Sequence, residues 1–269
     1  MTTACMLFLC GSLLLYLVAT LLFQVQFLLL NRTSLHVWGG RALLLGAVVS
    51  AIGLGLHFFF SRLSPLANML SMISLLLVVV VMTGLAAERW SRVPNVGLVV
   101  APLAFLSMLY PLLMPVRFEG AESVLLQFPW LGVHVLVTLL GYVGFALAFC
   151  GAVIYLIQMR MLKQGQLHRY LPALDTAGDA TFYAAGAGFS FFTVGLAMGV
   201  MWLFDTPGEF LGSRDPKIWM ALPTWVLFAA YLYARGIRHQ HGSRLKWLVV
   251  VGFISAAANL LGVRHQFIN

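Results

Sequence analysis

The chain has 269 residues, of which 61% are hydrophobic and only 9% are charged. A soluble domain of this length needs much more polar surface, so the composition excludes that class. The net charge of +8 does not indicate nucleic-acid binding, because the basic residues lie in short connections between apolar segments. Apolar runs of about 20 residues recur along the chain, the pattern of membrane-spanning helices. We therefore expect a lipid bilayer as a partner, and no nucleic acid.

The predicted fold is an all-α integral membrane protein, a bundle of about eight transmembrane helices. No polar stretch is long enough for a separate soluble domain, so residues 1–269 are predicted to form a single polytopic membrane domain. In chain order the predicted spans are Cys5–Leu30, Ala42–Phe60, Leu66–Ala87, Val93–Met114, Trp130–Gln158, Phe182–Phe204, Ile218–Gly236 and Trp247–Val263.

The basic residues predict the orientation of these spans. Eleven of the 16 lysines and arginines follow spans one, three, five and seven, and five lie in the other connections or beyond the last span. Connections rich in Lys and Arg stay in the cytoplasm, and an even number of spans puts both termini on the same side. Both termini are therefore predicted on the non-cytoplasmic side of a multi-pass protein of the bacterial inner (cytoplasmic) membrane.

Three histidines fall near the predicted outer face. His57 lies about one turn from the outer end of the second span, His134 about one turn into the fifth, and His265 just beyond the eighth. Haem iron takes one or two axial imidazoles, whereas a zinc or copper ion more often has carboxylate or thiolate ligands as well. His134 and His57 are thus candidate ligands of haem iron. The alternative is that each histidine hydrogen-bonds a neighbouring helix or the headgroup layer. The other histidines are expected in solvated cationic connections: His36, His168, His239 and His241.

The fifth predicted span carries a polar and partly small stripe at helical spacing: His134, Thr138, Gly141 and Tyr142. Such a stripe lets either a flat ligand or another helix approach closely. Gly195-x-x-x-Gly199 in the sixth span is interpreted as a helix-packing motif.

The predicted outer loop before the seventh span ends in Asp215-Pro216-Lys217. Asp followed by Pro is a good helix start, because the carboxylate caps unpaired amides and proline fits the first turn. Arg214 and Lys217 are candidates for contacts with carboxylates such as haem propionates, and the alternative is that they are ordinary interfacial cations.

These segments together resemble a known family. The run HVLVTLLGYVGFALAFCGAVIYLIQMRML, from His134, is similar to the histidine-bearing helix of the CcsA/CcmC/HemX-type cytochrome c assembly proteins. The runs DPKIWMALPTWVLFAAYLYAR and HGSRLKWLVVVGFISAAANLLGV are similar to their final helices. The family-like region is approximately residues 66–265.

The resemblance implies roles for individual residues. Haem-handling members carry a tryptophan-rich outer loop ending in W-D-P-K-E and flanked by outer histidines, which implies haem contacts for His134, Asp215 and Lys217. This chain departs from that pattern, because the loop has Phe210, Ser213 and Arg214 in place of tryptophans. The departures favour the HemX-like branch.

Two functional hypotheses follow. The first is a membrane protein of cytochrome c assembly type that binds or handles haem at the outer face, with cytochrome c maturation proteins as partners. Its expected haem-contacting residues are His134, His57, His265, Asp215, Arg214, Lys217 and Tyr142. The alternative is a HemX-like regulatory or scaffolding protein that acts on haem biosynthesis through its cytoplasmic connections without bound haem. The sequence shows no nucleophile–base pair or phosphate-binding loop, so no catalytic residue is predicted.

Overall fold

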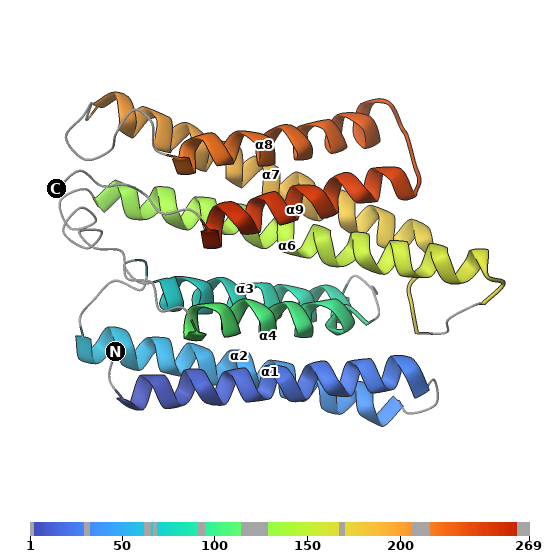
Figure 1. Cartoon of the computed structure of the whole chain (residues 1–269), viewed down its shortest axis with the longest axis horizontal. Coiled ribbons are helices and arrows are strands. Elements are labelled where there is room, and N and C mark those ends of the chain that lie inside the picture. The colour runs from blue at the N-terminus through green and yellow to red at the C-terminus, as the bar shows by residue number, and fades with distance from the viewer. Residues whose placement is uncertain are drawn as a thin grey trace. The chain divides into compact units, whose positions relative to one another are not determined.

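The computed structural model describes residues 3–29, 33–61, 66, 69–90, 95–113, 129–166, 170–205 and 216–262 (Figure 1). Over these ranges, all regular secondary structure is helical and no strand occurs. The helices are α1 Thr3–Leu29, α2 Thr33–Ser61, α3 Met69–Trp90, α4 Gly97–Leu113, α6 Pro129–Lys163, α7 Leu174–Asp205, α8 Pro216–Leu232, a π-helical turn Tyr233–Ile237, and α9 Ser243–Gly262.

The prediction of an all-α integral membrane bundle is confirmed. Each of the eight predicted spans coincides with one α-helix of the described residues. Six of them are long and apolar enough to cross a bilayer: α1, α2, α3, α6, α7 and α9. The helices α4 and α8 have 17 residues each, and α8 continues without a break into the π-helical turn. The orientation of the termini stays a prediction.

Two helices begin well before the predicted spans. The helix α2 starts at Thr33 and not at Ala42, and α7 starts at Leu174 and not at Phe182. Backbone hydrogen bonding does not stop where a chain leaves the lipid, so a helix continues into polar sequence until a cap or breaker ends it. In α7, Asp175 lies in the first turn, where a carboxylate interacts favourably with the helix dipole.

The chain divides into two compact units. Unit 1 comprises Met1–Phe118 and Met161–Ala173, and unit 2 comprises Glu119–Arg160 and Leu174–Asn269. In unit 1, α1 packs against α2 and α4, and α3 packs against α2 and α4 (Figure 1). Glycines permit these approaches: a Cβ added at Gly97 of α4 would lie 2.2 Å from the Phe23 ring of α1. The expectation of a single polytopic domain stays a prediction.

In unit 2, α6 and α7 run antiparallel in close backbone contact along a face that we call the glycine seam (Gly141, Gly144, Gly151, Gly188, Gly195 and Gly199). A Cβ added at Gly144 would lie 2.4 Å from the Cα of Gly188, and one at Gly151 would lie 2.7 Å from Thr181 Oγ1. One at Gly195 would lie 2.3 Å from Thr138 Oγ1. Along these contacts, positions advance along α6 as they recede along α7, with a shift of only one residue, so the antiparallel register is maintained along the pair.

Aromatic rings pack around the middle of the glycine seam. Phe145 of α6 stacks on Phe228 of α8 with centroids 3.7 Å apart and also contacts Phe192 of α7 at 5.3 Å. Gly252 of α9 also lies against this cluster, since an added Cβ would be 3.0 Å from the Phe228 ring. The helices α8 and α9 also pack on each other. The four helices of unit 2 therefore share one aromatic core, anchored on the α6–α7 pair.

The glycine seam predicts a position-specific cost for a single methyl group. Gly144→Ala puts that methyl into the backbone of α7, which cannot move aside, so we expect destabilisation by about 1–3 kcal/mol. The measurement is the apparent melting temperature of the purified protein in detergent. Gly186→Ala is the matched control, because an added Cβ there meets nothing within 4 Å. Equal melting temperatures for the two variants would contradict the close packing of α6 and α7 at the glycine seam.

Candidate functional site

His134 lies in the second turn of α6, where that helix faces the last part of α7. Its Nδ1 is 2.7 Å from the carbonyl oxygen of Gly195. Thr138, one turn further along α6, donates its hydroxyl hydrogen to the His134 carbonyl at 2.8 Å. The imidazole is therefore held by the backbone of the neighbouring helix.

The GxxxG motif of α7 makes the room for this contact. Gly195 exposes its carbonyl because no side chain separates it from α6, and Gly199 lies directly against the imidazole. A Cβ added at Gly199 would be 2.9 Å from His134 Cε1. The prediction that this motif serves helix packing is therefore too narrow, because the motif also positions a histidine.

The hydrogen bond to Gly195 determines which nitrogen of His134 carries the hydrogen. A carbonyl oxygen only accepts, so Nδ1 must be the donor. In the neutral ring, Nε2 is then the unprotonated, basic nitrogen. This is how metal-binding histidines are oriented, with one nitrogen donating to a carbonyl or carboxylate and the other facing the metal.

Tyr142 lies on the same stripe of α6 but inside the helix bundle. Its side chain is buried, and its ring contacts Phe192 of α7 edge-on at 5.6 Å. Gly141 also packs on Phe192, since an added Cβ would lie 2.8 Å from the Phe192 Cβ. The sequence left open whether the stripe faces a flat ligand or another helix. At Gly141 and Tyr142 it faces another helix, α7. The haem contact predicted for Tyr142 stays a prediction.

The other predicted site residues are placed less fully. His57 is buried in α2 and belongs to unit 1, whereas His134 belongs to unit 2. Their joint ligation of iron stays a prediction. His265, Arg214 and Asp215 lie outside the described residues. Lys217 is the second residue of α8, and its side chain is not described.

The donor set restricts the kind of metal centre. In the described part of the chain, no three His, Cys, Asp or Glu side chains are grouped so that they could share a metal ion. A structural zinc site has four protein ligands and a catalytic one has three. Haem iron needs only one or two, because the porphyrin supplies the others. One oriented imidazole such as that of His134 matches the one or two protein ligands that a haem iron takes.

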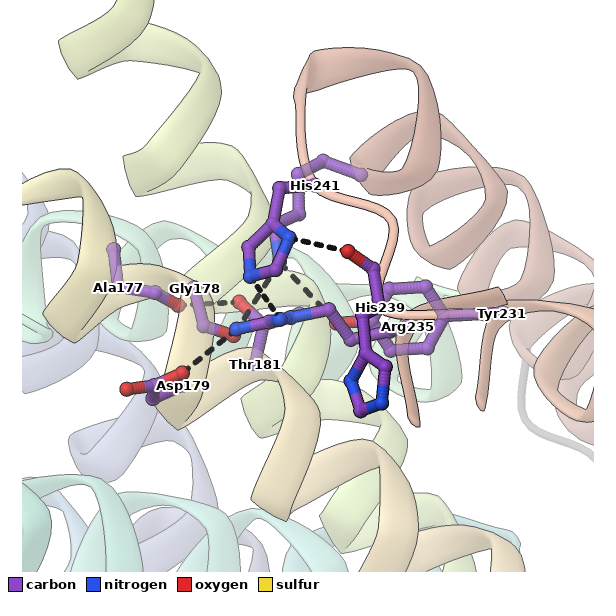
Figure 2. Close-up of polar contacts among 9 residues, drawn as sticks. Ala177, Gly178, Asp179, Thr181, Tyr231, Arg235, His239 and His241 are labelled. Carbon is purple, nitrogen blue, oxygen red and sulfur yellow. Dashed lines mark hydrogen bonds and ion pairs between the residues drawn. The ribbon is translucent and has the colours of Figure 1, made fainter. Parts of the chain in front are cut away.

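A second polar cluster joins the start of α7 to the turn between α8 and α9 (Figure 2). Arg235 donates from Nη2 to Asp179 Oδ1 at 2.9 Å, and its Nη1 contacts Nε2 of His241. His241 in turn donates from Nδ1 to the carbonyl oxygen of His239 at 2.7 Å. His241 was expected to be only a solvated loop residue. It is exposed, but it also links the turn to Arg235.

Lys246 lies beneath this cluster and is 3% exposed. Its Nζ donates to the Gly178 carbonyl at 3.3 Å and to the Tyr231 hydroxyl at 3.2 Å. The ammonium also lies 5.1 Å from the Tyr155 ring centroid and 5.4 Å from that of Tyr231. The charge count in the sequence places Lys246 in the connection after the seventh predicted span and does not predict its burial. The missed signal was its position directly before an apolar run, where a helix starting at Ser243 turns it toward the bundle.

Unit 1 has a polar group that the sequence also placed in a solvated connection. His36 lies in α2, half-buried, and its Nε2 is 2.9 Å from Glu88 Oε1 of α3. The same carboxylate oxygen accepts the backbone N–H of Asn95 at 3.2 Å, and the Asn95 side chain donates to the Tyr170 carbonyl at 3.1 Å. The expectation for His36 was wrong because α2 begins nine residues earlier than its apolar run.

The tautomer of His134 can be tested directly. In protein labelled with 15N-histidine, the nitrogen resonances of His134 should show a hydrogen on Nδ1 and a lone pair on Nε2. The resonances are assigned by their loss in His134→Ala, with His239→Ala as the control that removes an exposed histidine instead. A hydrogen found on Nε2 alone would contradict the bond to Gly195.

Comparison with known proteins agrees with the resemblance seen in the sequence. The family model described as "Cytochrome C assembly protein" matches residues 6–268, a wider region than the 66–265 predicted. "Cytochrome c biogenesis protein CcsA" of Guillardia theta is 26% identical over 246 residues, which cover 84% of this chain and 81% of that protein. The CcsA protein of a Picosynechococcus species is 25% identical over 318 residues, covering 91% of this chain and 94% of that one.

A solved structure shares the fold. "Cytochrome c Heme Lyase CcmF" superposes with a TM-score of 0.70 at 18% identity, over 97% of this chain and 46% of CcmF. At that identity the likeness concerns the fold, and this chain spans about half the length of CcmF. The HemX-like branch stays a prediction, since the relatives above are named CcsA. The match over nearly the whole chain, together with the helical bundle, shows that this protein belongs to the cytochrome c assembly family of multi-pass membrane proteins.

Proposed function

We propose that this protein binds haem through His134 at the outer face of the bacterial inner membrane and passes it on during cytochrome c assembly. The observation that supports the proposal most is the 2.7 Å contact between His134 Nδ1 and the Gly195 carbonyl. It orients the ring and leaves Nε2 as the basic nitrogen, the form that an iron ligand needs.

The location of the ring also favours a ligand role. An ionisable side chain within a membrane helix is expensive and is functional by default. His134 is half-buried, so the ring is neither fully solvated nor sealed in the core. Haem supplies an iron centre that takes an axial imidazole, and this chain's contribution is to hold that imidazole in one orientation.

Trp202 is a candidate for the apolar surface that a porphyrin needs. It is buried in α7 and lies on the same face as Gly195 and Gly199, at the helical spacing i, i+4, i+7. That face meets α6 at His134, so the indole lies about one turn further toward the end of α7. Stacking on a porphyrin would require this buried indole to become uncovered when haem binds.

The remaining ligand contacts are proposed from the sequence. The second axial ligand is His57 or His265, and Arg214, Asp215 and Lys217 are the residues proposed to orient the propionates. Cytochrome c maturation proteins are the proposed partners. The alternative, a HemX-like regulator acting through cytoplasmic connections without haem, is not favoured by the relatives, which are named for cytochrome c biogenesis.

The haem proposal predicts an absorption change in one histidine variant. Protein purified from haem-replete cells should show a Soret band that shifts on reduction, and His134→Ala should lose most of it, because the oriented ligand is gone. His239→Ala, which removes an exposed histidine outside the site, should keep the band. Wild-type protein with no band under these conditions would overturn the proposal.

Two additions separate loss of a ligand from loss of the fold. His134→Gly leaves space for a small ligand, so added imidazole should restore the band in part. Melting temperatures of all variants in the same detergent then report folding. Loss of the band together with a collapsed melting transition in both His134 variants, and no rescue, would assign His134 a structural role instead.

Gly199→Ala tests whether the orientation of the His134 ring matters, because it leaves the histidine itself in place. Its methyl group would lie 2.9 Å from the imidazole, so the ring must rotate or the helices must part. We expect haem affinity to fall by about 10-fold or more, in line with loss of an outer-shell partner at a metal site. The measurement is haem titration of the apoprotein, with Gly186→Ala as the control. Unchanged affinity in Gly199→Ala would mean that the position of the ring does not matter.

A further inference from the structure

The turn between α8 and α9 carries an excess of positive charge. In the described part of the protein, too few carboxylates lie near its cations to neutralise them. Residues Tyr233–Trp247 contain four Lys and Arg side chains and no Asp or Glu. One carboxylate reaches them, Asp179 of α7, and it pairs with Arg235 at 2.9 Å. Among the described residues, no acid lies within salt-bridge distance of the other three: Arg238, Arg244 and Lys246. We call these four side chains the basic surface (Arg235, Arg238, Arg244 and Lys246).

The buried member of this set strengthens the field at the surface. Lys246 Nζ contacts neutral groups, the Gly178 carbonyl and the Tyr231 hydroxyl. A carbonyl, a hydroxyl and two aromatic faces solvate the ammonium without adding a negative charge in direct contact with it. Because that charge lies in a low-dielectric environment, its attraction for an anion is screened less than that of a solvated lysine.

The backbone of the turn is held in one conformation. The Arg238 N–H donates to the Tyr233 carbonyl at 3.1 Å, closing the π-helical turn, and the Gln240 N–H donates to the Ala234 carbonyl at 3.0 Å. His239 follows with a positive φ of 49°, and Gly242 with one of 124°. His241 joins this backbone to Arg235, as Figure 2 shows. A π-helical turn of this kind often occurs at a functional site, and a preorganised surface loses less entropy on binding.

Exposed apolar side chains flank the exposed cations. Ile237 is 69% and Trp247 57% exposed, while Arg238 and Arg244 are also exposed. The turn leads into α9, which is long and apolar enough to cross a bilayer, so we expect these residues at the boundary between hydrocarbon and headgroups. Tryptophan prefers that layer, and the nearest abundant anion there is the lipid phosphate.

We propose that the basic surface is a binding site for the phosphate group of anionic phospholipids, with the acyl chains against Ile237 and Trp247. The excess of positive charge favours an anionic ligand, and the exposed Ile237 and Trp247 favour an anion that carries acyl chains. A soluble acidic protein would match the cations but would leave Ile237 and Trp247 without an apolar partner. The site is separate from His134, and its test does not involve haem, so the two proposals stand or fall independently.

The experiment measures lipid binding to the full-length protein. Purified protein is delipidated and titrated with phosphatidylglycerol or phosphatidylcholine in mixed micelles, and bound lipid is counted by native mass spectrometry. Phosphatidylglycerol should bind preferentially. Each cation near a membrane surface contributes about fivefold in affinity, so Arg238→Gln combined with Arg244→Gln should weaken binding by roughly 25-fold.

A matched control separates a site from general charge. Arg41→Gln combined with Arg89→Gln removes the same two charges from exposed positions in α2 and α3. This pair should weaken phosphatidylglycerol binding much less than the Arg238 and Arg244 pair, because only the cations of the basic surface are proposed to contact the bound phosphate. Equal weakening by both pairs would mean that net charge alone attracts the lipid, and this would overturn the proposal.

Two further arms complete the test. Arg238→Lys combined with Arg244→Lys keeps the charge and should keep most of the preference for phosphatidylglycerol, which guards against a folding defect in the glutamine pair. Inorganic phosphate at millimolar concentration should not displace the lipid. Full displacement by phosphate, or equal binding of phosphatidylcholine, would rule out an anionic-phospholipid site.

Discussion

The approach of the α6 and α7 backbones along the glycine seam is the constraint on which most of unit 2 depends. A Cβ at Gly144 would reach the Cα of Gly188, so the two helices are as close as main chains can pack. In a membrane, helices gain little from excluding water, and small residues let van der Waals contact replace that driving force. The same closeness brings a main-chain carbonyl of α7 within hydrogen-bond reach of His134 on α6. The close packing of α6 and α7 therefore also forms the candidate site.

That constraint also determines where polar side chains are tolerated. Thr138 and Thr181 return their hydroxyl hydrogens to carbonyls one turn earlier in their own helices, so neither carries an unpaired hydrogen into the seam. His134 uses a carbonyl of the opposite helix instead. Toward the other end of unit 2, Lys246 reaches a carbonyl of α7 and a tyrosine hydroxyl. In each case a main-chain acceptor meets the polar hydrogen, which avoids the cost of several kcal/mol that an unpaired group has in hydrocarbon.

The helical bundle and its family could be predicted from the sequence because long apolar runs and a few segments carry those signals. The structure around the polar residues at the ends of the helices could not be predicted in this way. His36 and Lys246 lie next to apolar runs, and hydropathy places such residues outside the membrane, yet the helices extend to include both. The role of Gly199 was also beyond the sequence. The GxxxG pattern predicts close packing, but which side chain of the opposite helix meets the glycine depends on the register of α6 and α7, which no single-helix pattern specifies.

The hydrogen-bond acceptor of His134 is a main-chain carbonyl and not a carboxylate, and this affects how the ring would hold a haem iron. A carboxylate partner would raise the basicity of the imidazole and tighten its bond to iron, but it would place a charge among membrane helices. The Gly195 carbonyl orients the ring without adding a charge. Under the proposed function, an uncharged partner then holds the ligand in one orientation, and no carboxylate has to enter the membrane helices to do so. The glycine seam thus supplies the contact that orients the ring with the main chain alone.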